Sequence, residues 1–307
     1  MSSTCDTCGK GVFYRRAYSG ESLCKSCFAD SIEDKAKKTI AKYGMFRHAD
    51  FIGVAVSGGK DSLSLFRVLS RIVAGHGSRL VALTIDEGIE GYRAESLSYV
   101  KEVAEQLGVP HLLYSYKELF GFTLDEALKD RRTKLSSCAI CGTLRRRAID
   151  VAATKAGVTV LATGHNLDDM VQTFIINLLN GDLKRIAWLN ASRDSENGFR
   201  VRRVHPFLEI YEKEIALYAF GNGIPLQTIP CPYRDEGIRS SVRACLNEME
   251  EKHAGMKYTL LKSALELSEK AIVEEPHLAN CSKCGFPSTS DPCSVCSLLD
   301  AVRSATV

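Results

Sequence analysis

The chain has 307 residues, of which 45% are hydrophobic, and its formal net charge is +3. No run of about eighteen apolar residues occurs, and the N-terminus has neither a basic segment nor an apolar one. Both facts argue against a membrane span and a secretory signal, and they make the cytoplasm the default location. The small net charge gives no general reason to expect a polyanionic partner, so local clusters must carry any argument for nucleic acid.

The two ends of the chain each carry four cysteines at the spacing of a zinc site. The first group reads C-x2-C, fifteen residues, C-x2-C, and the second reads C-x2-C, eight residues, C-x2-C. Four thiolates at about 2.3 Å enclose a zinc ion, and a binding free energy of about 10 to 16 kcal/mol can fold a segment that has no core of its own. Disulfide-stapled ends are the alternative, but nothing in the sequence indicates an oxidising compartment. We therefore expect zinc ligands in a module over residues 1–32 and in another over residues 276–307: Cys5, Cys8, Cys24 and Cys27, and Cys281, Cys284, Cys293 and Cys296.

Between these modules, apolar runs alternate with helical patterns. A chain of this length can bury about three quarters of its extended surface, enough for one large domain with small appendages. The alternation predicts a doubly wound parallel α/β sheet over residues 33–237, followed by a helical extension over residues 238–275. Ligands of such sheets bind beyond the carboxyl ends of the strands, where loops 57–61, 86–92 and 164–169 should converge. We expect strands at 51–56, 80–85, 111–114, 158–163 and 225–229, and helices at 62–74, 93–107, 142–156, 167–180 and 211–221.

The segment "FIGVAVSGGKDSLSLF" places a glycine-rich loop between the first of these strands and a helix. Gly58 and Gly59 allow the backbone to turn tightly and to approach a ligand, and the N-terminus of the helix favours an anion. Lys60 adds a positive charge, and the hydroxyl groups of Ser57 and Ser62 add donors, so the loop suits phosphate oxygens. The residues do not fit the Walker A pattern. They resemble instead the PP-loop, SGGxDS, of the ATP pyrophosphatases, which cleave ATP between the α and β phosphates and transfer AMP to an oxygen.

The segments "SSCAICGTLRRR" and "IPCPYR" carry three further cysteines, Cys138, Cys141 and Cys231. Their thiols could meet near the functional edge of the sheet, because Cys231 follows the last expected strand. Spacing alone leaves open a catalytic disulfide pair, a third zinc site, or an iron–sulfur cluster held by three thiolates. Another cysteine, Cys245, lies in a helical pattern, and we expect it to be a small buried side chain.

A basic run surrounds the first of these cysteine segments. Six basic residues occur between positions 131 and 147 without one carboxylate. Such a run is either a solvated helix face or a phosphate-binding surface. Beside a thiol pair in a nucleotide-binding protein we favour phosphates, which would make binding depend on salt. The residues are Arg131, Arg132, Lys134, Arg145, Arg146 and Arg147.

The segment "ATGHNLDDMVQ" ends a strand at Thr163 and begins another helix. Gly164 allows close approach, while His165, Asp168 and Asp169 crowd the start of the helix. The two acids can serve as a helix cap and a partner of the helix dipole. Beside an ATP loop, we expect one of them instead to orient a metal ion or to transfer a proton.

Taken together, "AVSGGKDS", "TIDEGIEGYR", "CAICGTLRRRAI", "ATGHNLDD", "HPF", "CPY" and the two cysteine modules resemble the tRNA 2-thiouridine synthetases of the TtuA/NcsA type. These are relatives of the eukaryotic cytoplasmic wobble-uridine thiolation subunit, and the similarity runs nearly end to end. The resemblance implies an enzyme that uses ATP to adenylate the C2 oxygen of a tRNA uridine and then replaces that oxygen with sulfur. It also implies a 4Fe-4S cluster on Cys138, Cys141 and Cys231, with one iron left open for sulfur.

The resemblance further implies that Lys60 and the loop amides hold pyrophosphate with Mg2+, and that Asp169, or alternatively Asp168, is the catalytic acid. Arg145 stands where some relatives have a lysine, and because arginine cannot shuttle a proton at neutral pH, an acid/base role at this position is in doubt. The three cysteines complete the catalytic set. The nucleotide site is expected to contain Ser57, Gly58, Gly59, Lys60, Asp61, Ser62, Ile85, Gly164, His165 and Asp168.

The partners that the resemblance implies are ATP with Mg2+, tRNA, a second copy of the chain and a sulfur donor, either sulfide or a thiocarboxylated ubiquitin-like protein; no membrane is implied. We expect the wobble uridine as the target, because "DEGIEGYR" and the triple arginine look closer to that branch, with a T-loop uridine as the alternative. Sulfur transfer through a persulfide and a disulfide, without a cluster, also remains open. So do a different PP-loop synthetase and a zinc-ribbon RNA-binding scaffold.

Overall fold

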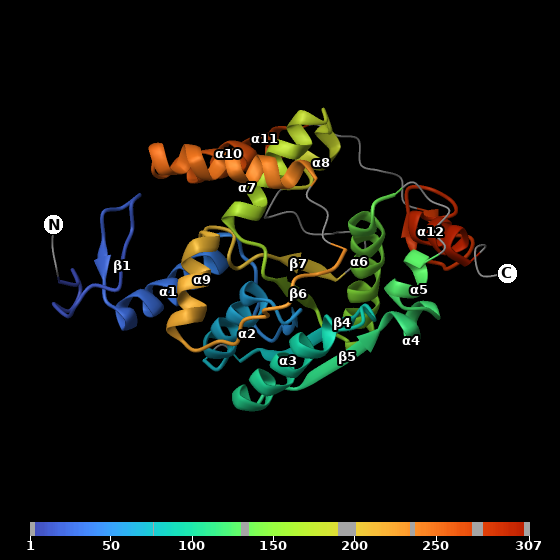
Figure 1. The fold of residues 1–307 in the computed structure, drawn as a ribbon, viewed down its shortest axis with the longest axis horizontal. Coiled ribbons are helices and arrows are strands. Elements are labelled where there is room, and N and C mark those ends of the chain that lie inside the picture. The colour runs from blue at the N-terminus through green and yellow to red at the C-terminus, as the bar shows by residue number, and fades with distance from the viewer. Residues whose placement is uncertain are drawn as a thin grey trace.

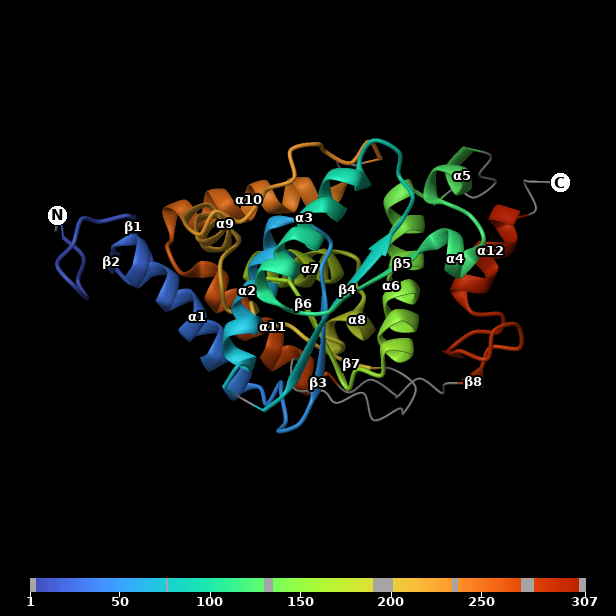
Figure 2. The same cartoon turned by 90° about the horizontal axis from the view of Figure 1, so that it is seen from below.

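The computed structural model describes residues 4–75, 77–129, 135–189, 201–233, 237–271 and 279–303. At its centre lies a five-stranded sheet in the order β5-β4-β3-β6-β7, in which all neighbouring strands are parallel (Figures 1 and 2). The strand order reverses between β3 and β6, so the predicted doubly wound fold is confirmed. The strands are β3 (Phe51–Ala55), β4 (Arg79–Asp86), β5 (His111–Ser115), β6 (Val160–Thr163) and β7 (Arg202–Val204).

Alternation along β3 gives the sheet two apolar faces. Ile52 and Val54 enter one buried cluster, while Phe51 and Ala55 pack against another. The first cluster is covered by helices α1 (Lys25–Lys42), α2 (Lys60–Val73), α3 (Arg93–Leu107), α7 (Leu167–Leu179) and α9 (Glu212–Gly221). The second is covered by α4 (Tyr116–Phe120), α5 (Leu124–Lys129) and α6 (Ser137–Ala156).

The helical extension forms a separate layer over α7 and α8 (Leu183–Ala187). It consists of α10 (Ile238–Lys252) and α11 (Met256–Lys270), and α11 packs on both of those helices (Figure 1). The predicted change from an α/β pattern to a helical one near residue 238 is therefore confirmed.

The two cysteine modules lie at opposite ends of the molecule (Figure 1). The N-terminal module pairs β1 (Tyr14–Arg15) with β2 (Ser22–Leu23) and continues directly into α1. The C-terminal module pairs β8 (Ala279–Asn280) with β9 (Pro287–Ser288) and ends in α12 (Ser294–Arg303), which packs on α5 and α6. The domain limits expected from the sequence stay predictions, and α1 runs across the first of them, between residues 32 and 33.

Four expected strands are confirmed, but the strand expected at 225–229 is wrong. That segment pairs with no strand, and its polar groups bind α3 and the residue before it. The Thr228 N–H donates to the Glu95 carboxylate at 3.2 Å, and Gln227 Nε2 donates to the Tyr92 carbonyl at 2.9 Å. The fifth strand is instead β7. Its three residues, two of them arginines, carry almost no apolar signal.

The helix expected at 142–156 begins earlier, at Ser137. Ser136 caps it, since the Ser136 Oγ accepts a hydrogen bond from the Ala139 N–H at 3.2 Å. Cys138 and Cys141 therefore lie in the first turns of α6 and not in a loop before it. Their i, i+3 spacing puts both on one side of the helix.

Cys245 is exposed, so its predicted burial is wrong. The residues of α10 that face the protein are Val242 and Leu246. Cys245 is displaced by about 100° from Leu246 around the helix and points away from the packed side.

Among the described residues, no helix is both long and apolar enough to cross a membrane.

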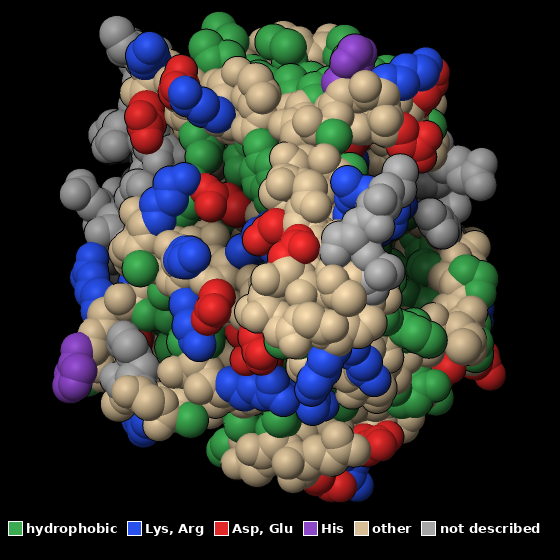
Figure 3. All heavy atoms as spheres, turned by 90° about the vertical axis from the view of Figure 1, so that its left-hand side faces the viewer, with side chains coloured by type: hydrophobic (Ala, Val, Ile, Leu, Met, Phe, Trp, Pro, Cys, Tyr) green, Lys and Arg blue, Asp and Glu red, His purple; other side chains and the backbone are tan. Residues whose placement is uncertain are grey.

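On the face of the molecule toward its N-terminal end, Lys and Arg side chains are spread widely, with Asp and Glu among them (Figure 3). The mixture of charges on this face agrees with the small net charge of the chain.

A buried ion pair attaches the N-terminal module to the sheet domain. Arg16 is 2% exposed and its Nε lies 2.6 Å from Oε1 of Glu214, a fully buried residue of α9. Tyr18 donates to the same carboxylate oxygen at 2.9 Å, and Lys35 Nζ lies 3.3 Å from the other oxygen. A buried carboxylate without its cation is costly, so this contact fixes the position of the module.

We predict that Glu214→Gln lowers the free energy of unfolding by about 3 kcal/mol, because the buried Arg16 then keeps only one carboxylate partner, the half-exposed Glu21 at 3.1 Å. Urea denaturation of the purified chain measures the change. Asp34→Asn is the control: Asp34 pairs with Lys37 on the surface, and its loss should cost less than about 0.5 kcal/mol. Equal losses in the two variants would contradict the prediction.

Candidate functional site

The predicted phosphate loop joins the end of β3 to the start of α2, at the carboxyl edge of the sheet. The Ser57 N–H donates to the Ser62 Oγ at 3.1 Å, and the Ser62 hydroxyl donates to the Gly59 carbonyl at 2.9 Å. These bonds close the loop around the first turn of α2, whose free N–H groups favour an anion. The strand order reverses here, which is where ligands of doubly wound sheets bind.

Two glycines of the site are required by close approaches. Gly58 has a φ of +88°, and a Cβ atom on it would lie 2.5 Å from the Ser96 carbonyl oxygen of α3. A Cβ atom on Gly164, just beyond β6, would lie 3.1 Å from the backbone of Asp61 and Ser62. The loops after β3 and β6 therefore touch, as the sequence predicted.

Lys60 and Asp61 form a charged group at the start of α2. Lys60 Nζ lies 2.9 Å from both Asp61 Oδ2 and Glu212 Oε1. Burial raises the pKa of Asp61 more than Lys60 lowers it, and the charges of Glu212 and Asp169 raise it further. Among the described residues, the buried Asp61 Oδ1 atom has no hydrogen-bond partner. A carboxylate oxygen of this kind, with other carboxylates close by, fits a hard cation such as Mg2+.

Asp168 and Asp169 lie side by side in the sequence but in different surroundings. Asp168 is 5% exposed, and both its oxygens are used: Oδ1 lies 2.5 Å from Lys257 Nζ of α11, and Oδ2 accepts from the Glu212 N–H at 2.7 Å. Asp169 shares a capping box with Asn166, in which its carboxylate accepts from the Asn166 N–H. The geometry gives Asp168 a structural role and leaves Asp169 the more open of the two carboxylates.

His165 and His205 meet at Thr163. The Thr163 Oγ1 lies 2.7 Å from His165 Nδ1 and 2.8 Å from His205 Nδ1. A hydroxyl has one proton, so it donates to one ring and accepts from the other, and the two imidazoles hold opposite tautomers. Burial, and then the charge of His165, lower the pKa of His205 to about 3, so His205 is neutral.

Ile85 lies at the carboxyl end of β4 and is buried. Its carbonyl accepts a hydrogen bond from Arg93 Nη2 at 2.8 Å. The Arg93 Nη1 donates to the Ser57 carbonyl at 2.9 Å. The ends of β3 and β4 are thus linked by one guanidinium group.

Cys138, Cys141 and Cys231 come together at the start of α6. Cys138 Sγ donates to the Tyr233 carbonyl at 3.4 Å, which joins α6 to the segment that carries Cys231. Burial raises the pKa of Cys141, with a contribution from the Cys231 charge, while Arg145 acts in the opposite direction.

The spacing of these three sulfurs bears on what they could hold. Among the described cysteines, the sulfurs of each four-cysteine group lie within 4.8 Å of one another, whereas these three do not form such a group. One zinc ion at about 2.3 Å would need its ligand sulfurs about 3.8 Å apart. A cluster binds each cysteine through a different iron, so the wider spacing fits a cluster better than a shared zinc ion.

The three consecutive arginines of α6 point to different partners. Arg145 Nη2 donates to Cys141 Sγ at 3.2 Å, and its Nε lies 2.7 Å from Glu87 Oε1. Arg147 donates to Cys284 Sγ at 3.4 Å and to Cys293 Sγ at 3.5 Å. Arg145 and Arg146 are both exposed, whereas Arg147 is half-buried. Arg131, Arg132 and Lys134 of the same basic run lie outside the described residues.

Each four-cysteine group could hold one metal ion. In the N-terminal group, the Cys8 and Cys24 sulfurs are 3.5 Å apart. In the C-terminal group, the Cys293 N–H donates to Cys281 Sγ at 3.3 Å, and the Cys296 N–H donates to Cys293 Sγ at 3.4 Å. Such N–H···S bonds orient thiolates around a structural zinc ion.

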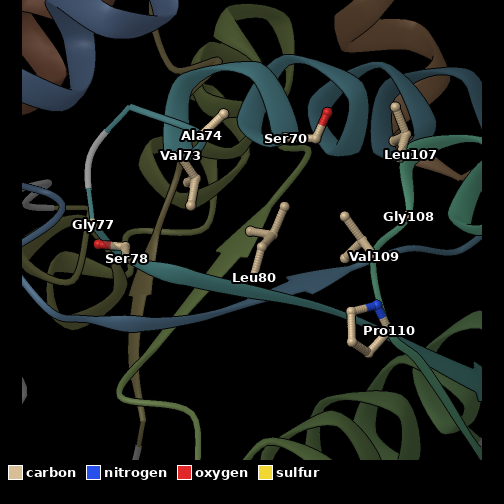
Figure 4. Close-up of a pocket in the computed structure, with 10 residues that line it drawn as sticks. All are labelled: Ser70, Val73, Ala74, Gly77, Ser78, Leu80, Leu107, Gly108, Val109 and Pro110. Carbon is tan, nitrogen blue, oxygen red and sulfur yellow. The ribbon is translucent and has the colours of Figure 1, made fainter.

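A pocket of about 390 Å3 lies at the other end of the sheet, between the C-terminal ends of α2 and α3 (Figure 4). The described residues that line it, from Ser70 of α2 to Pro110 before β5, include no acid, base or cysteine. This pocket therefore offers no catalytic group.

Sequence reasoning did not assign Glu87, Arg93, Glu212 or Lys257 to the site. Glu87 and Arg93 stand in the motif "DEGIEGYR", which follows the strand expected at 80–85. Their place beyond the carboxyl end of a strand was the signal that could have assigned them to the site. Lys257 comes from the helical extension, and no motif marks it.

An α/β sheet with SGGKDS in its first strand-to-helix turn, next to a lysine and several carboxylates, defines an ATP-binding protein of the PP-loop class. The PP-loop domain model matches residues 29–270, and the chain belongs to this family.

The chain is 35% identical over 298 residues to "Cytoplasmic tRNA 2-thiolation protein 1" of Drosophila melanogaster. The aligned part covers 96% of this chain and 87% of that relative. It is 36% identical over 298 residues to the "Probable sulfurtransferase" of Methanocaldococcus jannaschii, with 95% and 86% covered. Among solved structures, the U34-tRNA thiolase NcsA from Methanococcus maripaludis with its 4Fe-4S cluster matches with a TM-score of 0.84 and 30% identity, over 97% of this chain and 96% of that one.

We predict that Gly58→Ala lowers the free energy of unfolding by at least about 2 kcal/mol, because the new Cβ meets the backbone of α3 and the φ is unfavourable for alanine. Gly59→Ala is the matched control. Its new Cβ would have only one neighbour, Ser57 Oγ at 3.6 Å, and the change should cost less than about 1 kcal/mol. Urea denaturation distinguishes the two, and similar losses would show that the close approach to Ser96 is not rigid.

Proposed function

We propose that the chain is a cytoplasmic, ATP-dependent tRNA-uridine 2-sulfurtransferase. It adenylates the C2 oxygen of a uridine and replaces that oxygen with sulfur. The proposal rests on a continuous series of contacts between the phosphate loop and Cys141. Arg93 binds the loop, Glu87 binds Arg93 and Arg145, and Arg145 binds Cys141. ATP activation and sulfur delivery must take place close to each other, and this chain of contacts supports that requirement. The names of the relatives, which specify tRNA 2-thiolation and a U34-tRNA thiolase, support the reaction class.

The phosphate loop supplies the activation step. A uracil carbonyl oxygen is a poor leaving group, and attached AMP makes it a good one. Lys60 and the N–H groups at the start of α2 stabilise the charge of the departing pyrophosphate. Asp61, through its unpartnered Oδ1, would hold Mg2+, which spreads the phosphate charge. Gly164 and His165 line the same edge from β6.

Asp169 is our assignment for the acid. Both oxygens of Asp168 are already bound within the protein, so Asp168 instead orients the segment that carries Glu212. Arg145 stays charged at neutral pH, so it can stabilise an anion but cannot relay a proton.

Cys138, Cys141 and Cys231 would hold a 4Fe-4S cluster, and the solved relative contains a cluster of this kind. Three thiols are more than persulfide and disulfide transfer requires, and their spacing does not suit one zinc ion. When bound, a cluster with three protein ligands supplies an iron that has no protein ligand and can hold sulfur.

We assign the wobble uridine as the target, in keeping with the U34 specificity in the name of the solved relative. The two four-cysteine groups would each hold one zinc ion and keep the ends of the chain folded. The sulfur donor, sulfide or a thiocarboxylated ubiquitin-like protein, and a homodimeric state complete the proposal. The domain limits are those expected from the sequence, at residues 32, 237 and 275.

We predict that Lys60→Ala and Asp61→Ala each lower tRNA-dependent pyrophosphate release at least about tenfold, because one removes a phosphate contact and the other the unpartnered carboxylate. Lys37→Ala, which removes an exposed lysine from α1, is the control and should not change the rate. Unchanged release in both loop variants would reject this ATP site.

Nucleoside mass spectrometry of individual tRNAs tests the substrate. We predict that a strain without the gene loses 2-thiouridine from the wobble position, and that complementation with the wild-type gene, but not with a Cys141→Ala gene, restores it. Loss from the T-loop alone would exclude the wobble assignment.

A further inference from the structure

Glu87 is a buried carboxylate between two arginines. It is 2% exposed and follows directly after β4. Its Oε2 lies 2.8 Å from Arg93 Nε, and its Oε1 lies 2.7 Å from Arg145 Nε. Each oxygen of one carboxylate therefore meets a different guanidinium group.

The two arginines contact different parts of the site. Arg93 is buried, and its other two nitrogens donate to the carbonyls of Ser57 in the phosphate loop and Ile85 in β4. Arg145 has half of its side-chain surface exposed, and its Nη2 donates to Cys141 Sγ. Glu87 thus stands between the loop that would bind ATP and a cysteine that would deliver sulfur.

The charges suggest a purpose for this arrangement. Two guanidinium groups share one carboxylate, so the group keeps a net positive charge, and it is directed at a sulfur atom. The guanidinium of an arginine stays protonated at neutral pH, so Arg145 keeps its charge. Arg93 alone would suffice to join the ends of β3 and β4. The second contact of Glu87 serves Arg145.

We propose that Glu87 is the positioning residue of the sulfur-transfer step: it holds the Arg145 guanidinium against Cys141 Sγ and, through Arg93, fixes that contact relative to the phosphate loop. The proposal rests on the proposed function for the identity of the reaction. Without Glu87, Arg145 would lose the partner that holds Nε and would move into solvent, as long half-exposed side chains do.

The reduction potential of the reconstituted cluster tests this contact, because loss of the contact and loss of charge alone change the potential in opposite directions. A positive charge and an N–H···S bond at a ligand sulfur raise the potential. In Glu87→Gln, the loss of a negative charge alone would raise the potential, whereas release of Arg145 from the sulfur would lower it. We expect a lower potential in Glu87→Gln and in Arg145→Gln, and no further fall in the double variant. A higher potential in Glu87→Gln would overturn the proposal.

The surface residue Glu105 provides the matched control. It lies on α3, pairs with Lys101, and is 69% exposed, so Glu105→Gln makes the same change of charge without touching the site. The reduction potential of the cluster in Glu105→Gln should equal that in the wild type. If Glu87→Gln does not fold, Arg145→Lys takes its place. That variant keeps the charge but lacks the fork that reaches both Glu87 and Cys141, so we again expect a lower potential, and an unchanged one would overturn the proposal.

Thermal unfolding of the cluster-free chain gives an answer that does not depend on iron. If Glu87 holds Arg145, the two substitutions are not additive, and the double variant melts within about 1 °C of Glu87→Gln. Additive decreases in melting temperature would overturn the proposal. Wild-type protein that binds no iron under anaerobic reconstitution would instead count against the proposed function, and the melting temperatures would still decide the role of Glu87.

Discussion

A carboxylate removed from water must bind a cation or several hydrogen-bond donors, and this requirement connects the parts of the molecule. Glu214 of α9 binds Arg16 of the N-terminal module, Asp168 of α7 binds Lys257 of the helical extension, and Glu87 binds arginines from α3 and α6. Arg16, Lys257 and Arg145 come from segments far along the chain from the carboxylate that each one binds, whereas Arg93 lies six residues after Glu87. The sheet sets the fold, but these carboxylates fix how the added segments lie against the catalytic edge.

The second of these contacts brings the extension to the nucleotide site. The Asp168 carboxylate binds Lys257 on one side and the Glu212 N–H on the other, and the Glu212 side chain binds Lys60 in the phosphate loop. The extension therefore has a direct connection to the lysine expected to bind phosphate. A ligand that moves α11 would change the surroundings of Lys60 through only two intervening residues.

Local patterns in the sequence were enough for the central fold. The apolar run before the glycine loop, and the helix expected at 62–74, were found because a buried strand and an amphipathic helix each leave a clear period. Strand β7 was missed because most of its residues are arginines. The burial of Cys245 was misjudged because a shift of one residue around a helix moves a side chain from the packed side to the exposed side. The ion pairs Glu87–Arg145 and Asp168–Lys257 join residues far apart in sequence, so no local pattern could have shown that these cations bind these carboxylates.

The attachment of the C-terminal module to α6 has a consequence for the order in which the chain is made. Val295, Leu298 and three cysteines of the module share a buried cluster with α6: Cys281, Cys293 and Cys296. Arg147 donates to Cys293 of this cluster and to the exposed Cys284. A ribosome makes this segment after α6, so the newly made helix that carries Cys138 and Cys141 keeps an apolar side uncovered until the module has been synthesised. Closure of this core therefore follows the synthesis of more than a hundred residues that separate α6 from α12.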